Sequence, residues 1–282
     1  MELHDFHPAL GSPLAIPASV RGLFSSRGFR PKGHPSPGEW LAQHEEDGQS
    51  LEDFIRSRPN RPDDGRGVIY LQPMGEWCAD RCPPLGALEV YARTFFRQEV
   101  AVLPAISQDD LRVTQRLNPH EGQRQLLTTD ILRLLARSLP EDAFCMLGIS
   151  MIDLYPDPNW NFVFGQASLR NRVGVYSFAR YTKEGDAKLT LYRCLKVMAH
   201  EIGHMYGLTH CTFFECGLNG SNYLDESDRR PTHICPVCLR KLHWSADFDP
   251  LERYVELETV YRELGYVEPA EFLRERVKRM RN

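Results

Sequence analysis

The sequence at 200–210 reads H-E-I-G-H-M-Y-G-L-T-H. In a helix, His200 and His204 are four residues apart and therefore lie one turn apart on the same face. Two imidazoles in this arrangement can bind one metal ion, with zinc–nitrogen distances of about 2.0–2.1 Å. Glu201 is rotated by about 100° around the helix, so its carboxylate lies beside the metal. This position favours a role as general base over a role as ligand.

The residues after the second histidine predict a sharp turn. Gly207 follows the last expected helical turn, and only glycine adopts a left-handed helix end at low cost. The chain can then return and bring His210 towards the same ion. Three histidines with an open fourth position are typical of a catalytic zinc site, because a structural site is normally closed by a fourth protein ligand.

A second metal motif follows directly. Cys211 and Cys216 form a C-x4-C pair, and Cys235 and Cys238 form a C-P-V-C pair. Two such pairs can supply four thiolates to one tetrahedral zinc ion. Because the first cysteine is adjacent to the third histidine, this structural site would hold the loop that carries that histidine.

These motifs resemble the archaemetzincin family. The resemblance lies in H-E-I-G-H-M-Y-G-L-T-H-C, C-G-L-N-G-S-N, R-P and C-P-V-C-L-R-K-L within 200–242, and a G-E-W-L piece at 38–41 resembles the animal-type members. It implies a metzincin-type zinc peptidase with an additional four-cysteine site, and therefore two Zn²⁺ ions per chain. Leu218 departs from the pattern, because the family usually has the Met-turn methionine here, an apolar floor under the metal. A Leu-for-Met exchange nearly conserves volume and usually costs less than about 1.5 kcal/mol.

The hydrophobic pattern upstream predicts an α/β fold. Strands are expected at 68–74, 99–106, 145–154, 162–169 and 173–181, and helices at 85–97, 126–139 and 189–206. This order matches the metzincins, and the resemblance implies a mixed, mainly parallel, five-stranded twisted sheet with one antiparallel edge strand. We assign 162–168 to that edge. The expected substrate-binding residues, which would pair with an extended peptide, are Phe162, Val163, Phe164, Gly165 and Gln166.

Three regions are expected along the chain. Residues 1–66 are rich in Pro, Gly and Ser and predict an irregular extension and linker, with one short helix near 49–56. Residues 67–248 form the metzincin-like catalytic domain, which includes the four-cysteine zinc module at 211–242. Residues 249–282 form packing helices, with amphipathic segments at 251–264 and 271–279.

Composition narrows the classes of partner. The 282 residues carry a net charge of −4, which gives no electrostatic reason to expect nucleic acid or an anionic membrane. We find no apolar run of the length that spans a bilayer and no signal-peptide pattern. Buried thiols and a thiolate zinc site suit a reducing compartment, so we expect an intracellular protein, cytoplasmic or nuclear. The sequence leaves the oligomeric state open.

The function indicated is a zinc metallopeptidase, in which Glu201 assists the attack of a zinc-bound water on a peptide bond. The resemblance suggests restricted, aminopeptidase-like proteolysis. One alternative is a catalytically weak zinc scaffold that binds peptides, which the departure at Leu218 favours and an intact Glu201 disfavours. Another is a zinc-ribbon nucleic-acid binder, which the balanced charge of 211–243 disfavours. Cys78 and Cys82 form a weaker metal or redox candidate, and His233 and His243 are expected at the surface.

Overall fold

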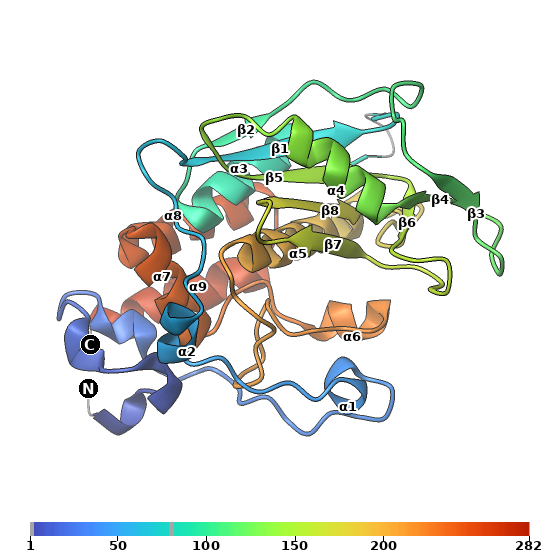
Figure 1. Cartoon of the computed structure of the whole chain (residues 1–282). Helices are drawn as coiled ribbons and strands as arrows, with labels where there is room; N and C mark the ends of the chain where they lie inside the picture. The colour runs from blue at the N-terminus through green and yellow to red at the C-terminus, as the bar shows by residue number, and fades with distance from the viewer. Residues whose placement is uncertain (1–2, 79–81, 282) are drawn as a thin grey trace. The chain divides into compact units, whose positions relative to one another are not determined.

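A five-stranded sheet forms from the apolar segments that the sequence marks as strands (Figure 1). Strands β1, β2, β5 and β8 pair in parallel, and β7 pairs antiparallel with β8 at one edge. The order across the sheet is β2 (Val100–Val102), β1 (Val68–Met74), β5 (Ala143–Ser150), β8 (Val173–Ser177) and β7 (Gly165–Ser168). The expected mixed, mainly parallel sheet with an antiparallel edge strand is confirmed.

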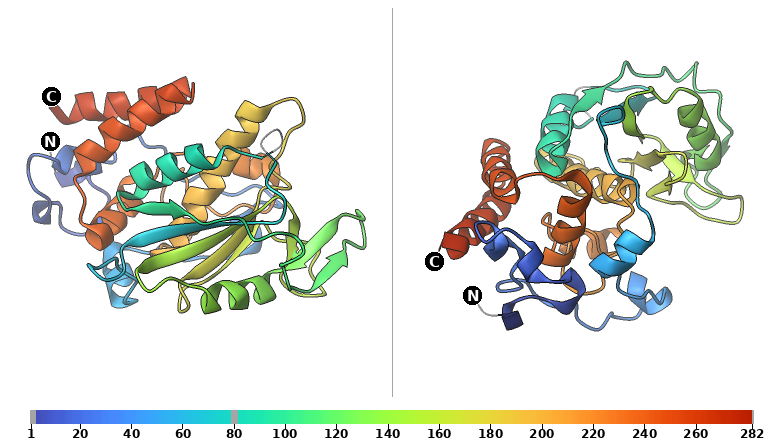
Figure 2. Two further views of the ribbon diagram at one scale, coloured as in Figure 1. Left: turned by 90° about the horizontal axis from the view of Figure 1, so that it is seen from above. Right: turned by 60° about the vertical axis from the view of Figure 1, so that its left-hand side comes forward.

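Helices cover both faces of this sheet. Helices α4 (Thr128–Arg137) and α5 (Ala187–Met205) both contact β7 and β8, and they do so from opposite sides (Figure 2). Every residue of β5 is buried, as expected of a strand that is covered on both faces. The core between the sheet and α4 contains Met74, Ile131, Leu135, Met146, Val173 and Val175.

The structure differs from the expected elements in several places. There is a second, three-stranded sheet, formed by β3 (Gln115–Leu117), β4 (Arg124–Leu127) and β6 (Asp153–Tyr155). It includes residues that the sequence pattern assigned to the helix at 126–139 and to the strand at 145–154. The predicted strand 145–154 is therefore confirmed over 145–150, but its continuation to 154 as one strand is wrong. Strand β5 ends at Ser150, whose hydroxyl accepts a hydrogen bond from the Ile152 amide (3.0 Å) and turns the chain.

The edge strand also begins later than predicted. Val163 forms an antiparallel bridge with Leu154 of the smaller sheet. This part of the chain therefore pairs with the smaller sheet before β7 begins at Gly165. Strand β2 is likewise shorter than the expected 99–106.

The computed structural model describes residues 3–78 and 82–281, and by its contacts the chain divides into two units. The sheet unit comprises 60–93 and 98–205. The cysteine unit comprises 1–59, 94–97 and 206–282, so the N-terminal residues group with the C-terminal helices. Helix α3 (Leu85–Phe96) contributes to both units. The domain boundaries expected from sequence stay a prediction.

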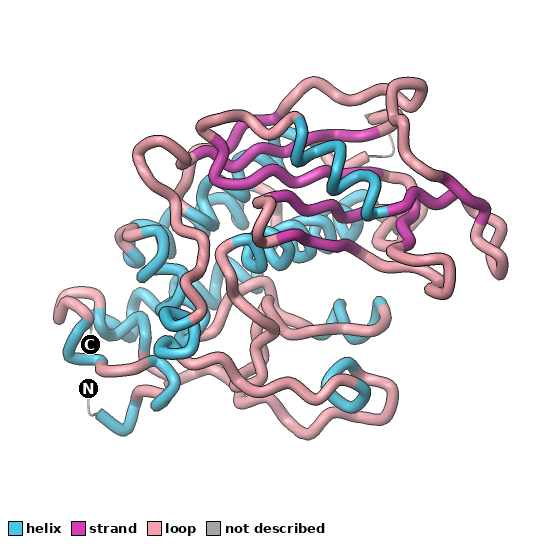
Figure 3. Tube along the Cα trace, in the orientation of Figure 1, coloured by secondary structure: helices cyan, strands magenta, loops and turns pink. Residues whose placement is uncertain are grey.

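In the cysteine unit, short helical pieces alternate with irregular chain (Figure 3). Although the N-terminal segment has little regular structure, Leu10, Leu23, Phe24 and Phe54 are fully buried. Helices of this unit are α1 (Trp40–Gln43), α2 (Leu51–Arg56), α6 (Leu224–Arg229), α7 (Pro236–Ala246), α8 (Pro250–Glu263) and α9 (Val267–Arg281), with 3-10 turns η1 (Leu3–Asp5), η2 (Pro8–Leu10), η3 (Pro13–Ala15) and η4 (Arg21–Phe24). Every helix among the described residues is too short or too polar to cross a lipid bilayer.

Candidate active site and metal centres

Helix α5 carries the first two histidines. Its first turn is capped by Asp186, whose carboxylate accepts from the Leu189 amide (2.9 Å). The Nε2 atoms of His200 and His204 lie 3.0 Å apart. Two ligands at a tetrahedral zinc ion with bonds of about 2.1 Å would be separated by about 3.4 Å, so the pair fits one ion with little movement.

The turn after α5 has the geometry that the sequence predicts. Gly207 has φ of 84°, and a Cβ atom there would lie 2.8 Å from Cβ of Pro59. Any residue other than glycine would therefore be strained in its backbone conformation and would also clash with Pro59. His210 follows this turn, and the ring nitrogens that His200, His204 and His210 offer lie within 4.8 Å of one another. All three are sufficiently close to share a metal ion.

Glu201 faces the edge strand of the same unit. A Cβ atom at Gly165 would lie 3.1 Å from the Glu201 carboxyl carbon and 2.9 Å from the Val175 carbonyl oxygen. Glycine at the first position of β7 therefore leaves room for the glutamate. The charge of Glu201 also contributes to raising the pKa of Tyr176 well above its usual value, although burial of the phenol is the larger cause. The sequence pattern did not reveal this need for a glycine at 165, and the substrate-binding role expected of Gly165 stays a prediction.

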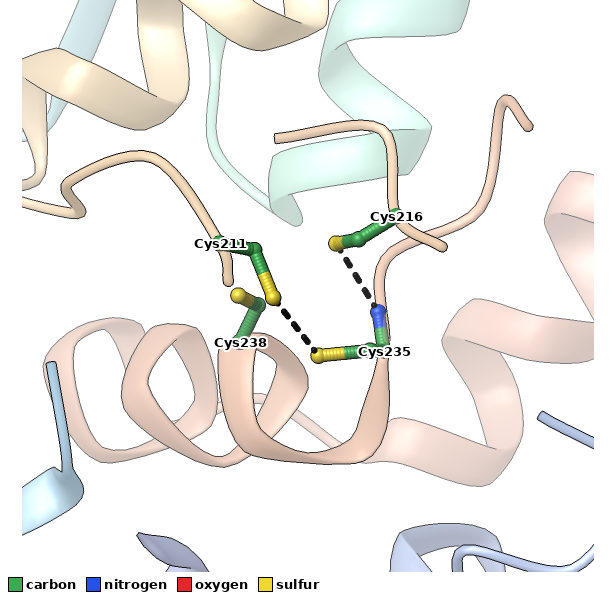
Figure 4. A group of neighbouring side chains, drawn as sticks. All are labelled: Cys211, Cys216, Cys235 and Cys238. Atoms are coloured by element: carbon green, nitrogen blue, oxygen red, sulfur yellow. Dashed lines mark hydrogen bonds between the residues drawn. The ribbon is translucent and has the colours of Figure 1, made fainter. Parts of the chain in front are cut away.

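The four cysteines converge within the cysteine unit, where their sulfur atoms gather in one place (Figure 4). Cys211, Cys216, Cys235 and Cys238 are all buried thiols rather than disulfides, and their sulfur atoms lie within 4.8 Å of one another. The Sγ atoms of Cys211 and Cys235 are 3.5 Å apart. Sulfur atoms bound tetrahedrally to zinc at about 2.3 Å would be about 3.8 Å apart, so the group has the dimensions of a zinc site.

The surroundings of these thiols also suit a metal. Burial raises the pKa of Cys216 and Cys235 well above the usual value, whereas hydrogen bonds from the other three thiols lower that of Cys211. The Cys235 amide donates to Cys216 Sγ (3.2 Å), a bond that is stronger to a thiolate than to a neutral thiol. A zinc ion would hold all four as thiolates at neutral pH.

Asn219 closes the loop between the first two cysteines, and sequence reasoning gave it no role. Its carbonyl oxygen accepts from the Cys216 amide (2.8 Å), and its amide group donates to the carbonyls of Cys211 (2.6 Å) and Phe214 (2.9 Å). The asparagine in C-G-L-N was the available signal. Leu218 is buried beside it, and its carbonyl accepts from the Cys211 amide (2.9 Å). The Met-turn position is therefore part of the cysteine loop, and its effect on activity stays a prediction.

Of the five expected substrate-binding residues, two lie in the edge strand. Gly165 and Gln166 belong to β7, and the Gln166 side chain accepts a hydrogen bond from the Thr128 hydroxyl on α4. Phe162 and Phe164 instead pack edge to face with ring centroids 5.3 Å apart. The Arg180 guanidinium lies 3.6 Å from the centroid of the Phe162 ring, which further indicates a packing role.

The other candidate residues are not part of the three-histidine group or the four-cysteine group. A cavity of about 840 Å³ opens at the carboxyl ends of β1, β5 and β8, and Cys78 and Cys82 line it. The Cys82 amide donates to the Cys78 carbonyl (2.8 Å), while residues 79–81 between them are outside the described residues. His233 stacks on Phe272 with ring centroids 3.7 Å apart. It is therefore not the surface residue that the sequence suggested.

The comparisons with known proteins agree with this geometry. The model of peptidase family M54 matches residues 126–244. Archaemetzincin-2 of Rattus norvegicus is 39% identical over 264 residues, covering 81% of this chain and 74% of that protein; the Homo sapiens archaemetzincin-2 is 37% identical over 265 residues, covering 81% and 73%.

A solved structure shows the same relationship. The crystal structure of archaemetzincin from Methanopyrus kandleri superposes with a TM-score of 0.51 at 28% identity, over 65% of this chain and 97% of that one. The chain therefore belongs to the archaemetzincins, peptidase family M54, a family of zinc metallopeptidases.

Proposed function

We propose that this protein hydrolyses peptide bonds with a zinc ion held by His200, His204 and His210, and that a second zinc ion is held by the four cysteines. The observation that carries the proposal is the convergence of three imidazole nitrogens within 4.8 Å, with no carboxylate among them. Three neutral ligands leave the full charge of the ion available, and they leave a coordination position open for catalysis.

The residues around the ion have separate tasks. When bound, zinc supplies Lewis acidity, which acidifies water and polarises the scissile carbonyl. Glu201 accepts the proton of the attacking water and later passes it to the departing amine, as a general base and then a general acid. Its position beside the first residue of β7 supports this role, because a substrate held along that strand would present its backbone to the carboxylate.

The edge strand supplies the expected site for the substrate. Strand β7 pairs with β8 on one side and ends the order of the described sheet on the other. An extended peptide could add there as a further strand, with main-chain hydrogen bonds giving affinity for varied sequences. From the family resemblance we further propose that the cleavage is restricted to small peptides and is aminopeptidase-like.

The proposal is tested by metal analysis together with digestion of a peptide library. We expect two zinc ions per chain in the wild type and in Glu201→Gln, and a fall in kcat of about 10²–10⁴-fold in the variant. Glu141→Gln, at an exposed position just before β5, is the matched control and should cleave as the wild type does.

Each other outcome has a definite meaning. Loss of zinc together with activity in Glu201→Gln would make that glutamate structural. Two zinc ions without cleavage by either protein would overturn the peptidase proposal and favour a peptide-binding scaffold.

A further inference from the structure

Part of the N-terminal segment is hydrogen-bonded to helix α6 and to the loop before it, which follow the first cysteine pair. The Trp40 amide donates to both carboxylate oxygens of Glu226, at 3.0 and 3.2 Å, and the Asn222 side chain donates to the Gly38 carbonyl (3.0 Å). Glu226 is 4% exposed and also accepts from the Asn222 amide (2.7 Å). A buried carboxylate that accepts hydrogen bonds from one backbone amide in each of two segments fixes one segment against the other.

The indole of Trp40 lies next to the third histidine. Its ring meets the His210 ring edge to face, with centroids 4.8 Å apart and an interplanar angle of 73°. Gly220 makes room for it, because a Cβ atom at that position would lie 2.3 Å from Cδ1 of the indole. Any other residue at 220 would displace the tryptophan.

Glu46 completes the arrangement. Its carboxylate lies 2.8 and 3.1 Å from Nδ1 of His210, and the Trp40 indole N–H donates to the same carboxylate (3.0 Å). An ionised carboxylate can only accept, so Nδ1 of His210 carries the proton. The lone pair of this imidazole is then on Nε2, which is the atom left to bind a metal.

We propose that Glu46 is a positioning residue for the third zinc ligand, and that Trp40 holds Glu46 in place. The inference rests on the proposed function, because it assigns His210 to the catalytic zinc. Carboxylates that accept from the far nitrogen of a metal-bound histidine fix its tautomer and orientation and increase its basicity, and their removal typically costs 10- to 100-fold in metal affinity. The N-terminal segment would thus contribute directly to metal binding by orienting His210.

The test measures zinc retention rather than turnover. Purified protein comprising residues 1–282, with two zinc ions, is titrated with a chelator, and zinc release is followed for the wild type, Glu46→Ala and Glu46→Gln. We expect Glu46→Ala to release one zinc ion 10- to 100-fold more readily, while the other, in the cysteine site, is unchanged. Glu46→Gln keeps an acceptor oxygen without the charge and should fall between the two. Glu45→Ala, at the exposed neighbouring position, should match the wild type.

A second measurement addresses the tautomer directly. In nitrogen-15 NMR spectra of the histidine rings, the wild type should show a protonated Nδ1 on His210, and this signal should be lost or exchange-broadened in Glu46→Ala. The retained cysteine-site zinc serves as the internal check that the variant is folded.

The outcomes separate this inference from the proposed function. A wild type that holds only the cysteine-site zinc would overturn the proposed function itself. Two zinc ions with equal release in wild type and Glu46→Ala would overturn the positioning role alone. Tighter zinc binding in Glu46→Ala, with higher activity, would show that the carboxylate obstructs the site and would likewise overturn it.

Discussion

The sheet unit and the cysteine unit are stabilised by different kinds of contact. In the sheet unit, Leu71, Met146 and Val175 are at most 1% exposed and belong to neighbouring parallel strands. The cysteine unit buries several charged side chains as well as apolar ones. Lys241, for example, is 1% exposed and donates to the backbone carbonyl (3.1 Å) and side chain (2.9 Å) of Gln49.

This difference predicts different responses to substitution and to metal removal. Apolar burial contributes about 25 cal/mol per Å² and tolerates changes that conserve volume. Buried charges and thiols are stable only while their partners remain, because an unpaired buried polar group costs about 1–3 kcal/mol or more. The cysteine unit should therefore depend on its metal, while the sheet unit should not.

The largest effect is expected from Cys235→Ser. Removing one thiolate should abolish tight binding at the cysteine site, and with it most of the roughly 10–16 kcal/mol that structural zinc contributes in small zinc domains. We expect zinc content to fall by at least one ion per chain. Hydrogen exchange should accelerate in α7 and the N-terminal segment, whereas the amides of β5 should stay protected.

Cys145→Ala is the matched control, because Cys145 is a buried thiol in the sheet unit. Burial raises the pKa of this thiol far above its usual range, so it behaves as a small apolar side chain. Its replacement should leave the zinc content unchanged. Equal zinc content in Cys235→Ser and the wild type would contradict a role for Cys235 as ligand.

The sequence was most informative where structure depends on neighbours along the chain. The apolar period of Ile131 and Leu135 predicted α4 correctly, and both residues are fully buried. It failed at Ser150, because a hydrogen bond from the Ile152 amide to the Ser150 hydroxyl ends the strand within a continuous apolar run. Periodicity contains no information about such a bond.

The same limit applies to the candidate site. His200 and His204 can be predicted to share a face because helical spacing is local, and their Nε2 atoms are 3.0 Å apart. Glu46 is 164 residues from its partner His210 in sequence. No spacing rule relates residues so distant, and the irregular segment around Glu46 offers no period from which its direction could be inferred.

A smaller effect is expected from Arg276→Met, which tests how α9 holds the N-terminal segment. The Arg276 guanidinium is 3% exposed and donates to the carbonyls of Leu23 and Ser25, each at 2.8 Å. Methionine fills much of the volume but leaves both carbonyls without this donor, at a cost of about 2–4 kcal/mol. Chemical denaturation should show the loss, and the amides of η4 should exchange faster.

Lys278→Met is the control for this substitution. Lys278 lies on the same helix and pairs only at the surface with Glu275 (2.9 Å), so its replacement should change the free energy of unfolding by less than about 1 kcal/mol. Equal destabilisation by the two variants would show that the guanidinium bonds contribute nothing beyond helix propensity.

The smallest expected effect concerns pH and His243. Its ring lies between Phe24 and Phe248, with centroids 5.5 and 5.7 Å away, and its Nδ1 accepts from the Arg240 guanidinium (3.2 Å). Burial is the main cause that lowers the pKa of this imidazole below its usual 6.5, and the charge of Arg240 adds to it. The native protein therefore keeps His243 neutral at pH values where the unfolded chain is protonated.

The sign of the pH effect follows from that difference. Well above pH 6.5 the imidazole is neutral in both states and does not affect stability. Below it, the unfolded chain binds a proton that the native protein does not, so the free energy of unfolding falls by at most about 1.4 kcal/mol per pH unit. His243→Gln should therefore lose less stability between pH 7 and pH 5.5 than the wild type, at equal zinc content, in thermal unfolding. The control is His120→Gln, at an exposed position, which should keep the wild-type dependence of stability on pH. If stability fell equally with pH in all three proteins, His243 would titrate equally in the folded and the unfolded chain.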